Sequence, residues 1–269
     1  MQPHDGIEMS TLTWSPNRRA TVAIAAIILF VITEIVLRPM AIEQCSARAG
    51  YGILQCFSIR LYAPRIILPF LFVMAIFGLR PSLSILGIDR PVAPGLILAI
   101  SATSFMGIGL AFSHQPSEAS DLVPVLLRRA LVSGLTEEVL YRGFLFGILF
   151  RVARISFIPA AIASAALFGA MHVAQGADLI ESVIIFAVTS IGGSWFAWLF
   201  VAWGNNIWVP ASLHVSMNGL WELFEVSNTA AGSFLTDLLR ASVIVVSIML
   251  TWLYTKHRGV AERTGSLKA

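Results

Sequence analysis

The amino-acid composition is that of a chain whose surface faces mostly lipid. Of the 269 residues, 57% are hydrophobic and only 12% carry a charge, and the mean hydropathy is +0.81. Soluble proteins carry about 25% charged residues, so this chain lacks the polar surface that water requires. These values exclude a disordered chain, a soluble nucleic-acid-binding protein and a disulfide-stapled scaffold. They indicate a multi-spanning integral membrane protein.

The net charge of +3 does not indicate nucleic-acid binding either. Lysine and arginine occur singly or in pairs between apolar runs, without a basic stripe and without interleaved aromatic residues. This distribution is typical of charges that set the orientation of a chain in a membrane. The expected partners are therefore membrane lipid and a membrane-associated substrate.

Apolar segments long enough to cross a membrane follow one another along the chain, and no repeat or second domain interrupts them. We expect an all-α transmembrane bundle over residues 20–255, between a cytoplasmic N-terminal segment (1–19) and a C-terminal tail (256–269). Connections after the fourth span are short, which favours antiparallel neighbours in one bundle. The eight predicted spans are Ala20–Leu37, Ala63–Leu79, Pro94–Phe112, Leu131–Phe150, Phe157–Gln175, Leu179–Trp203, Trp208–Val226 and Phe234–Tyr254.

The distribution of lysine and arginine outside the spans favours a cell-membrane protein with both chain ends in the cytoplasm. The first predicted loop and the first residues of the second span run against this pattern, because together they contain four arginines: Arg38, Arg48, Arg60 and Arg65.

The same loop contains Cys45 and Cys56, the only two cysteines of the chain. With the N-terminus inside, this loop faces an oxidising compartment, where a disulfide across about ten residues can form. Two unrelated thiols are the alternative. We predict a disulfide.

Ionisable residues within apolar runs are informative, because each costs about 2.5–3.5 kcal/mol at the centre of a membrane helix. The fourth predicted span contains the sequence Glu137-Glu138-x-x-x-Arg142. Helix neighbours lie three or four positions apart, so Glu138 and Arg142 share a face while Glu137 points about 100° away. We expect Arg142 to neutralise Glu138 and to leave Glu137 available for chemistry. A Glu138–Arg142 pair that only locks helix packing is the alternative.

Two further polar motifs follow. Phe168-x-x-x-His172 ends the fifth span, where a lone histidine is more often a structural hydrogen-bonding residue than a catalyst. His214-x-x-x-Asn218 in the seventh span places an imidazole and an amide on one helix face, as a catalytic pair or as part of an interhelical hydrogen-bonding seam. Together, the polar residues of the three spans are those needed to activate water and to stabilise an oxyanion.

These three motifs, in this order and on separate helices, resemble those of the CPBP family, which comprises the type II CAAX prenyl endopeptidases and the bacteriocin-processing Abi proteins. The resemblance covers about residues 131–226. It implies an intramembrane endopeptidase for a CAAX-type substrate or for a leader or sorting signal. It further implies that Glu137 and His172 activate water and that His214 and Asn218 stabilise the oxyanion. The other motif residues then support the site: Glu138, Arg142 and Phe168.

Other functions fit the same polar cluster. Two histidines and two carboxylates are ligands that zinc accepts, but the helical His-Glu-x-x-His pair is absent. We therefore expect a glutamic-type enzyme without a cofactor, and a zinc-dependent protease is the alternative. A transporter would use the cluster as a proton or substrate path, although no repeat is detectable. A non-catalytic scaffold or immunity protein would keep the fold, although the motif residues are intact.

Overall fold

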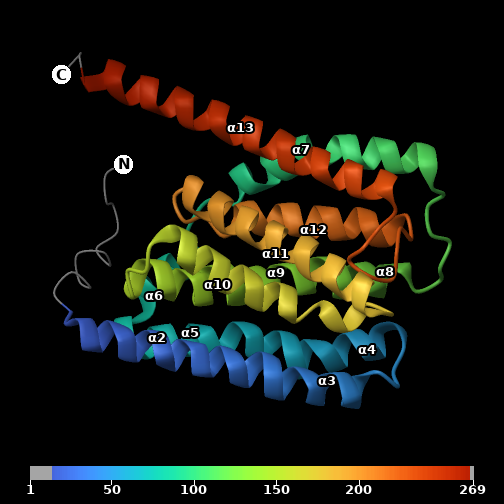
Figure 1. The fold of residues 1–269 in the computed structure, drawn as a ribbon, viewed down its shortest axis with the longest axis horizontal. Helices are drawn as coiled ribbons and strands as arrows, with labels where there is room; N and C mark the ends of the chain where they lie inside the picture. Colours follow the sequence, from blue (N-terminus) through green and yellow to red (C-terminus); the bar gives the residue numbers. More distant parts are fainter. Residues whose placement is uncertain (1–13, 267–269) are drawn as a thin grey trace.

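A computed structural model describes the backbone of residues 14–266 and the side chains of residues 14–256. Every regular element in this range is helical, and the long helices run side by side along one direction (Figure 1). The predicted all-α membrane bundle is confirmed. Of the predicted terminal segments, residues 1–13 and 267–269 lie outside the described residues.

Six helical stretches in the described range are long and apolar enough to cross a membrane. Their outward faces carry large exposed apolar side chains, for example Ile100 at 68% and Val245 at 62% exposure, as expected for contact with lipid. The six stretches are Pro16–Cys45, Gly50–Phe77, Ala93–Ser113, Phe157–Gln175, Leu179–Ala202 and Phe234–Lys256.

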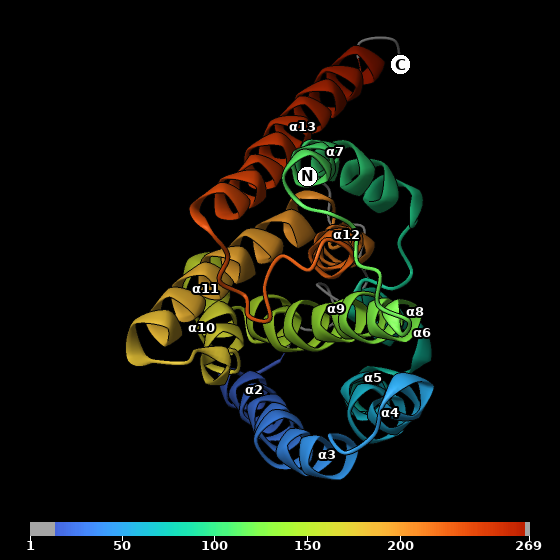
Figure 2. The ribbon, with the colours of Figure 1, turned by 90° about the vertical axis from the view of Figure 1, so that its right-hand side faces the viewer.

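The remaining two predicted spans are the ones that carry the first and third polar motifs. The fourth lies in a continuous helical run from Leu122 to Val152. This run contains six charged residues and is therefore not among the six apolar stretches. The seventh lies in α12 (Trp208–Leu223), which has 16 residues. In Figure 2 the helices α2–α5 (residues 16–77) lie below this helical run, which we call the central run. The helices α10 (Phe157–Ala170) and α11 (Leu179–Ala202) lie beside it, and α7 (Ala93–Ser113) and α13 (Phe234–Ser266) cover α12. The two polar helices therefore form the interior of the bundle.

The first two membrane helices form a long hairpin. Its first arm comprises α2 (Pro16–Val31), a π-helical segment (Ile32–Leu37) and α3 (Arg38–Cys45); its second comprises α4 (Gly50–Phe57), a π-helical segment (Ser58–Tyr62) and α5 (Ala63–Phe77). Ser15 caps the start of the first arm by accepting a hydrogen bond from the Arg18 backbone N–H.

The predicted first loop is therefore wrong in extent, because both arms continue as helices well beyond the predicted spans. Of the four arginines that ran against the expected orientation, only Arg48 lies in the connection 46–49. Arg65 is buried, at 2% exposure. The helices continue through Arg38 and Arg65 because Glu34 neutralises both cations. This removes most of the conflict between the first loop and the expected orientation.

A disulfide joins Cys45 and Cys56, whose Cα atoms lie 5.7 Å apart, and the predicted bridge is confirmed. It ties the two arms together at the turn of the hairpin. Around it lies a small apolar cluster that we call the disulfide cluster. Its buried members are Ala41, Cys45, Cys56, Phe57, Leu61 and Tyr62.

The main core packs on the second half of the central run. Phe144 and Phe146 are fully buried there, and Phe146 meets Phe157 of α10 and Phe200 of α11 edge to face. Such pairs contribute about 0.5–1.5 kcal/mol beyond their buried area.

The central run comprises α8 (Leu122–Val125), α9 (Ser133–Glu138) and the π-helical segments Leu126–Val132, Val139–Phe146 and Ile148–Val152. The other helices are α6 (Leu79–Leu86), α7 (Ala93–Ser113), α10 (Phe157–Ala170), α11 (Leu179–Ala202) and α13 (Phe234–Ser266).

Candidate active site

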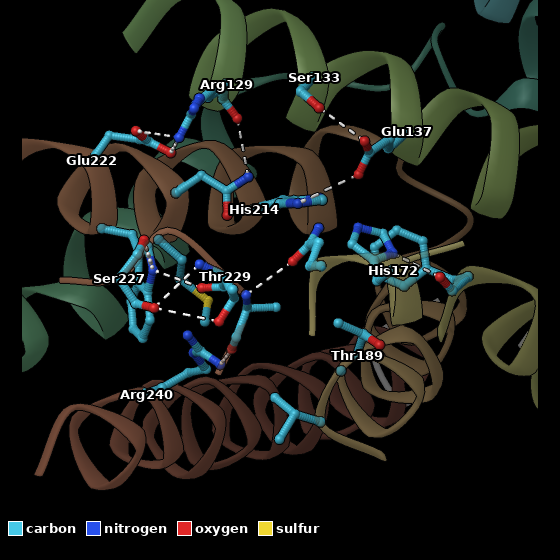
Figure 3. Close-up of a pocket in the computed structure, with 18 of the residues that line it drawn as sticks. Arg129, Ser133, Glu137, His172, Thr189, His214, Glu222, Ser227, Thr229 and Arg240 are labelled. Carbon is cyan, nitrogen blue, oxygen red and sulfur yellow. Dashed lines mark hydrogen bonds and ion pairs between the residues drawn. The ribbon is translucent and has the colours of Figure 1, made fainter. Parts of the chain in front are cut away.

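A cavity of about 620 Å³ lies within the bundle, between the central run, α10, α11, α12 and α13. Its wall brings together five of the seven motif residues. Figure 3 shows Glu137, His172 and His214 converging on one part of it from three different helical segments. Glu138 and Arg142 lie behind the wall at 0% and 1% exposure. The five lining residues are Glu137, Phe168, His172, His214 and Asn218.

The two oxygens of Glu137 have different surroundings. Oε1 accepts hydrogen bonds from Ser133 Oγ at 2.8 Å and from Arg65 Nη1 at 3.1 Å. Oε2 lies 3.9 Å from His214 Nε2 (Figure 3). Oε1 is therefore held by Ser133 and Arg65, and Oε2 is the oxygen turned towards His214.

Glu137 has a cationic partner from another helix, Arg65. The sequence argument considered only neighbours one turn away on the same helix, and Arg65 comes from α5. Arg65 belongs to a buried ionic network that the sequence analysis did not predict. Arg65 binds Glu34 with two hydrogen bonds, Nε to Oε1 at 2.7 Å and Nη2 to Oε2 at 2.8 Å. Tyr141 Oη also donates to Glu34 Oε2 at 3.3 Å.

A signal for this network is present in the sequence. Glu34 and Arg65 are charged residues beside long apolar runs, and such residues in membrane helices pair with one another. The choice of partner depends on how the hairpin packs against the central run. The spacing of residues along one helix does not show how that helix packs against another.

His172 is held in a defined tautomer at the end of α10. Its Nδ1 lies 2.7 Å from the backbone oxygen of Phe168. A carbonyl oxygen only accepts hydrogen bonds, so Nδ1 carries the proton and Nε2 of the neutral ring is an acceptor. Arg38 Nη1 donates to the backbone oxygen of Met171 at 2.8 Å and so holds the segment that carries the histidine.

His214 is held by Glu138. Its Nδ1 lies 2.7 Å from Glu138 Oε1, and the same oxygen accepts a hydrogen bond from Arg142 Nη1 at 2.9 Å. The predicted Glu138–Arg142 pair is confirmed. The carboxylate does more than lock the helix, because it also fixes the imidazole ring, with Nε2 turned towards Glu137.

Aromatic rings and a small residue complete this arrangement. The guanidinium carbon of Arg142 lies 4.5 Å from the centre of the Phe168 ring and 5.3 Å from that of Phe196, at cation–π distance. Gly134 allows α9 to approach α12, since a Cβ atom there would lie 3.1 Å from Val215 Cγ2. This close approach brings His214 within reach of both glutamates.

Asn218 lies one turn beyond His214 and also lines the cavity. Its Nδ2 donates to the backbone oxygen of Arg129 at 3.3 Å, which leaves one N–H of the amide for another acceptor. One turn further on, Glu222 pairs with Arg129 at 3.4 Å. The polar face of α12 thus runs along the cavity in the direction that the sequence predicts.

Glu138→Gln is expected to lower both the melting temperature and any activity. The substitution leaves the Arg142 charge buried without its partner, and breaking a buried ion pair in this way costs about 3–5 kcal/mol. The measurement is a pair of melting curves in detergent. As control, Glu118→Gln removes an exposed carboxylate from a connecting loop and should melt like the wild type. A melting temperature of Glu138→Gln equal to that of the control would contradict a structural role for the pair.

The donor set fits a resident metal poorly. Among the described residues, no group of three His, Cys, Asp or Glu side chains comes together in a way that could hold a metal ion. Of the nearest candidates, Glu137 is already bound by the Arg65 cation. A cation close to a ligand oxygen disfavours a second cation there.

The family comparison agrees with the motifs. Residues 119–220 match the family model described as "Type II CAAX prenyl endopeptidase Rce1-like". This region is Rce1-like. The Rce1-like region includes all seven motif residues and runs from just before α8 to Leu220 of α12, and it leaves the hairpin and α13 outside the match. The predicted resemblance is confirmed. No curated protein and no solved structure matches the chain.

Proposed function

We propose that this protein is a glutamic-type intramembrane endopeptidase that hydrolyses a peptide bond in a membrane-associated protein or peptide. The Rce1-like region supports a CAAX-type intramembrane protease. The observation that carries the proposal is the convergence of the Glu137 side chain with two oriented histidines in a cavity inside the bundle. The six candidate spans make the protein a multi-pass membrane protein, and we place it in the cell membrane.

In the proposed reaction, water is activated between Glu137 and His172. Glu137 Oε2 takes the proton as the water oxygen attacks the peptide carbonyl, because Oε1 is occupied by Ser133 and Arg65. His172 Nε2, the acceptor nitrogen of its tautomer, orients the water by accepting its other hydrogen. The proton held by Glu137 then passes to the leaving amine, so that water is added across the bond.

The oxyanion that forms at the carbonyl needs hydrogen-bond donors. Asn218 has an N–H that is not used by Arg129, and a protonated His214 donates from Nε2. The Glu138 carboxylate on Nδ1 stabilises the imidazolium, as a buried carboxylate does in other hydrolases. Removing one donor of this kind costs about 10²–10³-fold in rate. Phe168 and Arg142 hold the two histidines and Glu138 in place.

The decisive experiment is a cleavage assay with purified protein in lipid vesicles. The substrates are a panel of membrane-anchored peptides, some with a prenylated CAAX end and others with a leader or sorting signal, and products are identified by mass spectrometry. The proposal expects a new peptide terminus with the wild type and none with Glu137→Ala. The absence of product with every peptide would contradict it in favour of a transporter or a scaffold, and equal product from both proteins would show that the cleavage does not depend on Glu137.

Activity is expected to survive the removal of metal ions. In the proposed mechanism Glu137 and His172 polarise water without a metal, so EDTA should inhibit slowly or not at all, and purified enzyme should contain less than one zinc per chain. Elemental analysis and a chelator titration check both statements. Loss of activity with EDTA, followed by rescue with added zinc, would instead make His172 and His214 metal ligands.

A further inference from the structure

We infer that the cavity opens towards the extracytoplasmic face of the membrane, and that the peptides it cleaves present their scissile bonds from that face. The statement about substrates rests on the proposed protease function. The statement about direction rests on two other features, the disulfide and the distribution of cations between the two ends of the bundle.

Four connections meet at the end of the bundle that we call the cavity end: residues 46–49, 114–121, 171–178 and 224–233. Hydrogen bonds join them. The Ser117 backbone N–H donates to the Leu223 oxygen at 2.7 Å, and the Ala230 N–H donates to Gln175 Oε1 at 3.0 Å. Thr229 Oγ1 also donates to Glu181 Oε1 at 3.1 Å. In Figure 1 these connections lie together on the right.

The cavity reaches this end. Part of its lining comes from the loop after α12, at Ser227, Asn228 and Thr229, and from Gln175 in the turn after α10. Another part comes from the disulfide cluster, which contributes Phe57, Leu61 and Tyr62 to the wall. The disulfide and the mouth of the cavity therefore belong to the same end of the molecule.

The disulfide gives the first indication of direction. Disulfides form and persist in oxidising compartments and are rare in the reducing cytosol. Cys45 and Cys56 are bridged at the cavity end. The cavity end is therefore extracytoplasmic.

The cations give the second indication. The four connections of the cavity end contain one Lys or Arg, Arg48, and three of them contain acidic residues. The opposite end holds the connections 87–92, 153–156 and 203–207, and the Ile207 N–H joins two of them by donating to the Gly87 oxygen at 3.2 Å. Cytoplasmic segments carry the excess of Lys and Arg. The connections of the opposite end contain two such cations, Arg90 and Arg154, and four more lie in the helices beside them: Arg18, Arg19, Arg80 and Lys256.

The other cations near the cavity end lie within helices. Arg60 is exposed on the second arm of the hairpin, and the protein binds the rest. Arg129 pairs with Glu222 at 3.4 Å, and Arg240 donates to the Ala230 oxygen at 2.7 Å. Arg38 is bound to Met171 and Glu34. These three arginines stabilise the cavity wall, so we do not count them among the cations that indicate a cytoplasmic face.

The direction restricts the substrate. A peptide segment has no partners for its backbone N–H and C=O groups in the hydrocarbon, so it does not cross the membrane to reach a cavity on the other side. A lipidated C-terminus held in the cytoplasmic leaflet is therefore excluded. The accessible class is a membrane-anchored or exported peptide whose cleavage site lies at the outer face.

Two single-cysteine variants test the direction. Asn228→Cys lies at the mouth of the cavity, and the matched Ser156→Cys lies in the connection before α10 at the opposite end; both positions are exposed. The native cysteines are bridged, so each variant has one free thiol. A membrane-impermeant maleimide added to intact bacterial cells that express the protein should label Asn228→Cys and leave Ser156→Cys unlabelled.

Inside-out vesicles should give the reverse pattern, and the wild type should remain unlabelled in both preparations. Labelling of Ser156→Cys and not of Asn228→Cys in intact cells would overturn the inference. Rapid labelling of the wild type without reductant would also overturn it, because it contradicts the disulfide on which the direction depends.

Peptide termini test the substrate class. Termini that appear in the membranes of cells with wild-type protein and disappear with Glu137→Gln are expected to map to extracytoplasmic segments of membrane-anchored or exported proteins. Termini that map to cytoplasmic segments would overturn the inference and leave the protease function intact. The absence of any Glu137-dependent terminus would overturn the proposed function and, with it, the substrate class, whereas the labelling result would stand.

Discussion

Glu137→Gln is expected to reduce the rate of peptide cleavage by about 10²–10⁴-fold, the usual contribution of a general base. Glutamine keeps the shape of the side chain and still accepts hydrogen bonds from Ser133 and Arg65 through its oxygen. The amide that replaces Oε2 cannot take a proton from water. The melting temperature should fall little, because Arg65 keeps both hydrogen bonds to Glu34. The measurement is the cleavage rate and the melting temperature of the same preparation.

Glu222→Gln is the matched control for this experiment. Glu222 is another carboxylate of the cavity wall, and it pairs with Arg129, whose side chain is 44% exposed. An ion pair of this kind contributes about 0–1 kcal/mol, so the variant should stay close to the wild type in both measurements. If Glu137→Gln keeps more than about a hundredth of the wild-type rate, the loss of a general base has not occurred and the assignment of Glu137 is wrong.

The sequence predicted those parts of the site that depend on one helix. Glu138 and Arg142 stand one turn apart on any helix, and the structure joins them. His214 and Asn218 likewise share a face of α12 and line one cavity. The disulfide followed from the presence of two cysteines in a short stretch between helices.

The sequence did not predict the contacts between helices. Arg65 was counted with the arginines of the first loop, because it lies at the start of the second predicted span, and the structure places it inside a helix against Glu34 and Glu137. The hydrogen bond from His214 to Glu138 is of the same kind. Both depend on the rotation of one helix against another. Residue spacing fixes which side chains share a face and leaves open which face meets which.

The π-helical segments were also beyond the sequence argument. They flank α9 on both sides, at Leu126–Val132 and Val139–Phe146. Such segments are rare and occur often at functional sites. A spacing argument based on 3.6 residues per turn assigns faces correctly over one turn, as for Glu138 and Arg142, and drifts over longer distances when a π-helical segment intervenes.

Arg65→Met is expected to destabilise the protein by about 3–5 kcal/mol, because it removes the cation that is hydrogen-bonded to the buried Glu34 and leaves only Arg38, at 3.6 Å. Glu34 is 0% exposed and loses two hydrogen bonds, while Glu137 loses one and keeps Ser133. The melting temperature in detergent measures the loss. A cleavage assay on this variant alone would be ambiguous, since a poorly folded enzyme is also inactive.

The double variant Glu34→Gln/Arg65→Met separates the two effects. It removes both charges of the buried pair, and replacing a buried ion pair by neutral groups of similar volume is often neutral or stabilising. We therefore expect the melting temperature to recover towards that of the wild type. The cleavage rate should not recover with it, because Arg65 Nη1 no longer holds Glu137 Oε1, and Oε2 loses its fixed direction towards the histidines.

The expected signature of the double variant is a reduced kcat with a KM close to that of the wild type. A misplaced base weakens an interaction made only in the transition state and leaves substrate binding in place. Recovery of both the melting temperature and kcat would show that the ion pair only supports the fold. A low kcat in a protein that melts like the wild type would make Arg65 a positioning residue for Glu137. The hairpin would then belong to the working enzyme although it lies outside the Rce1-like region.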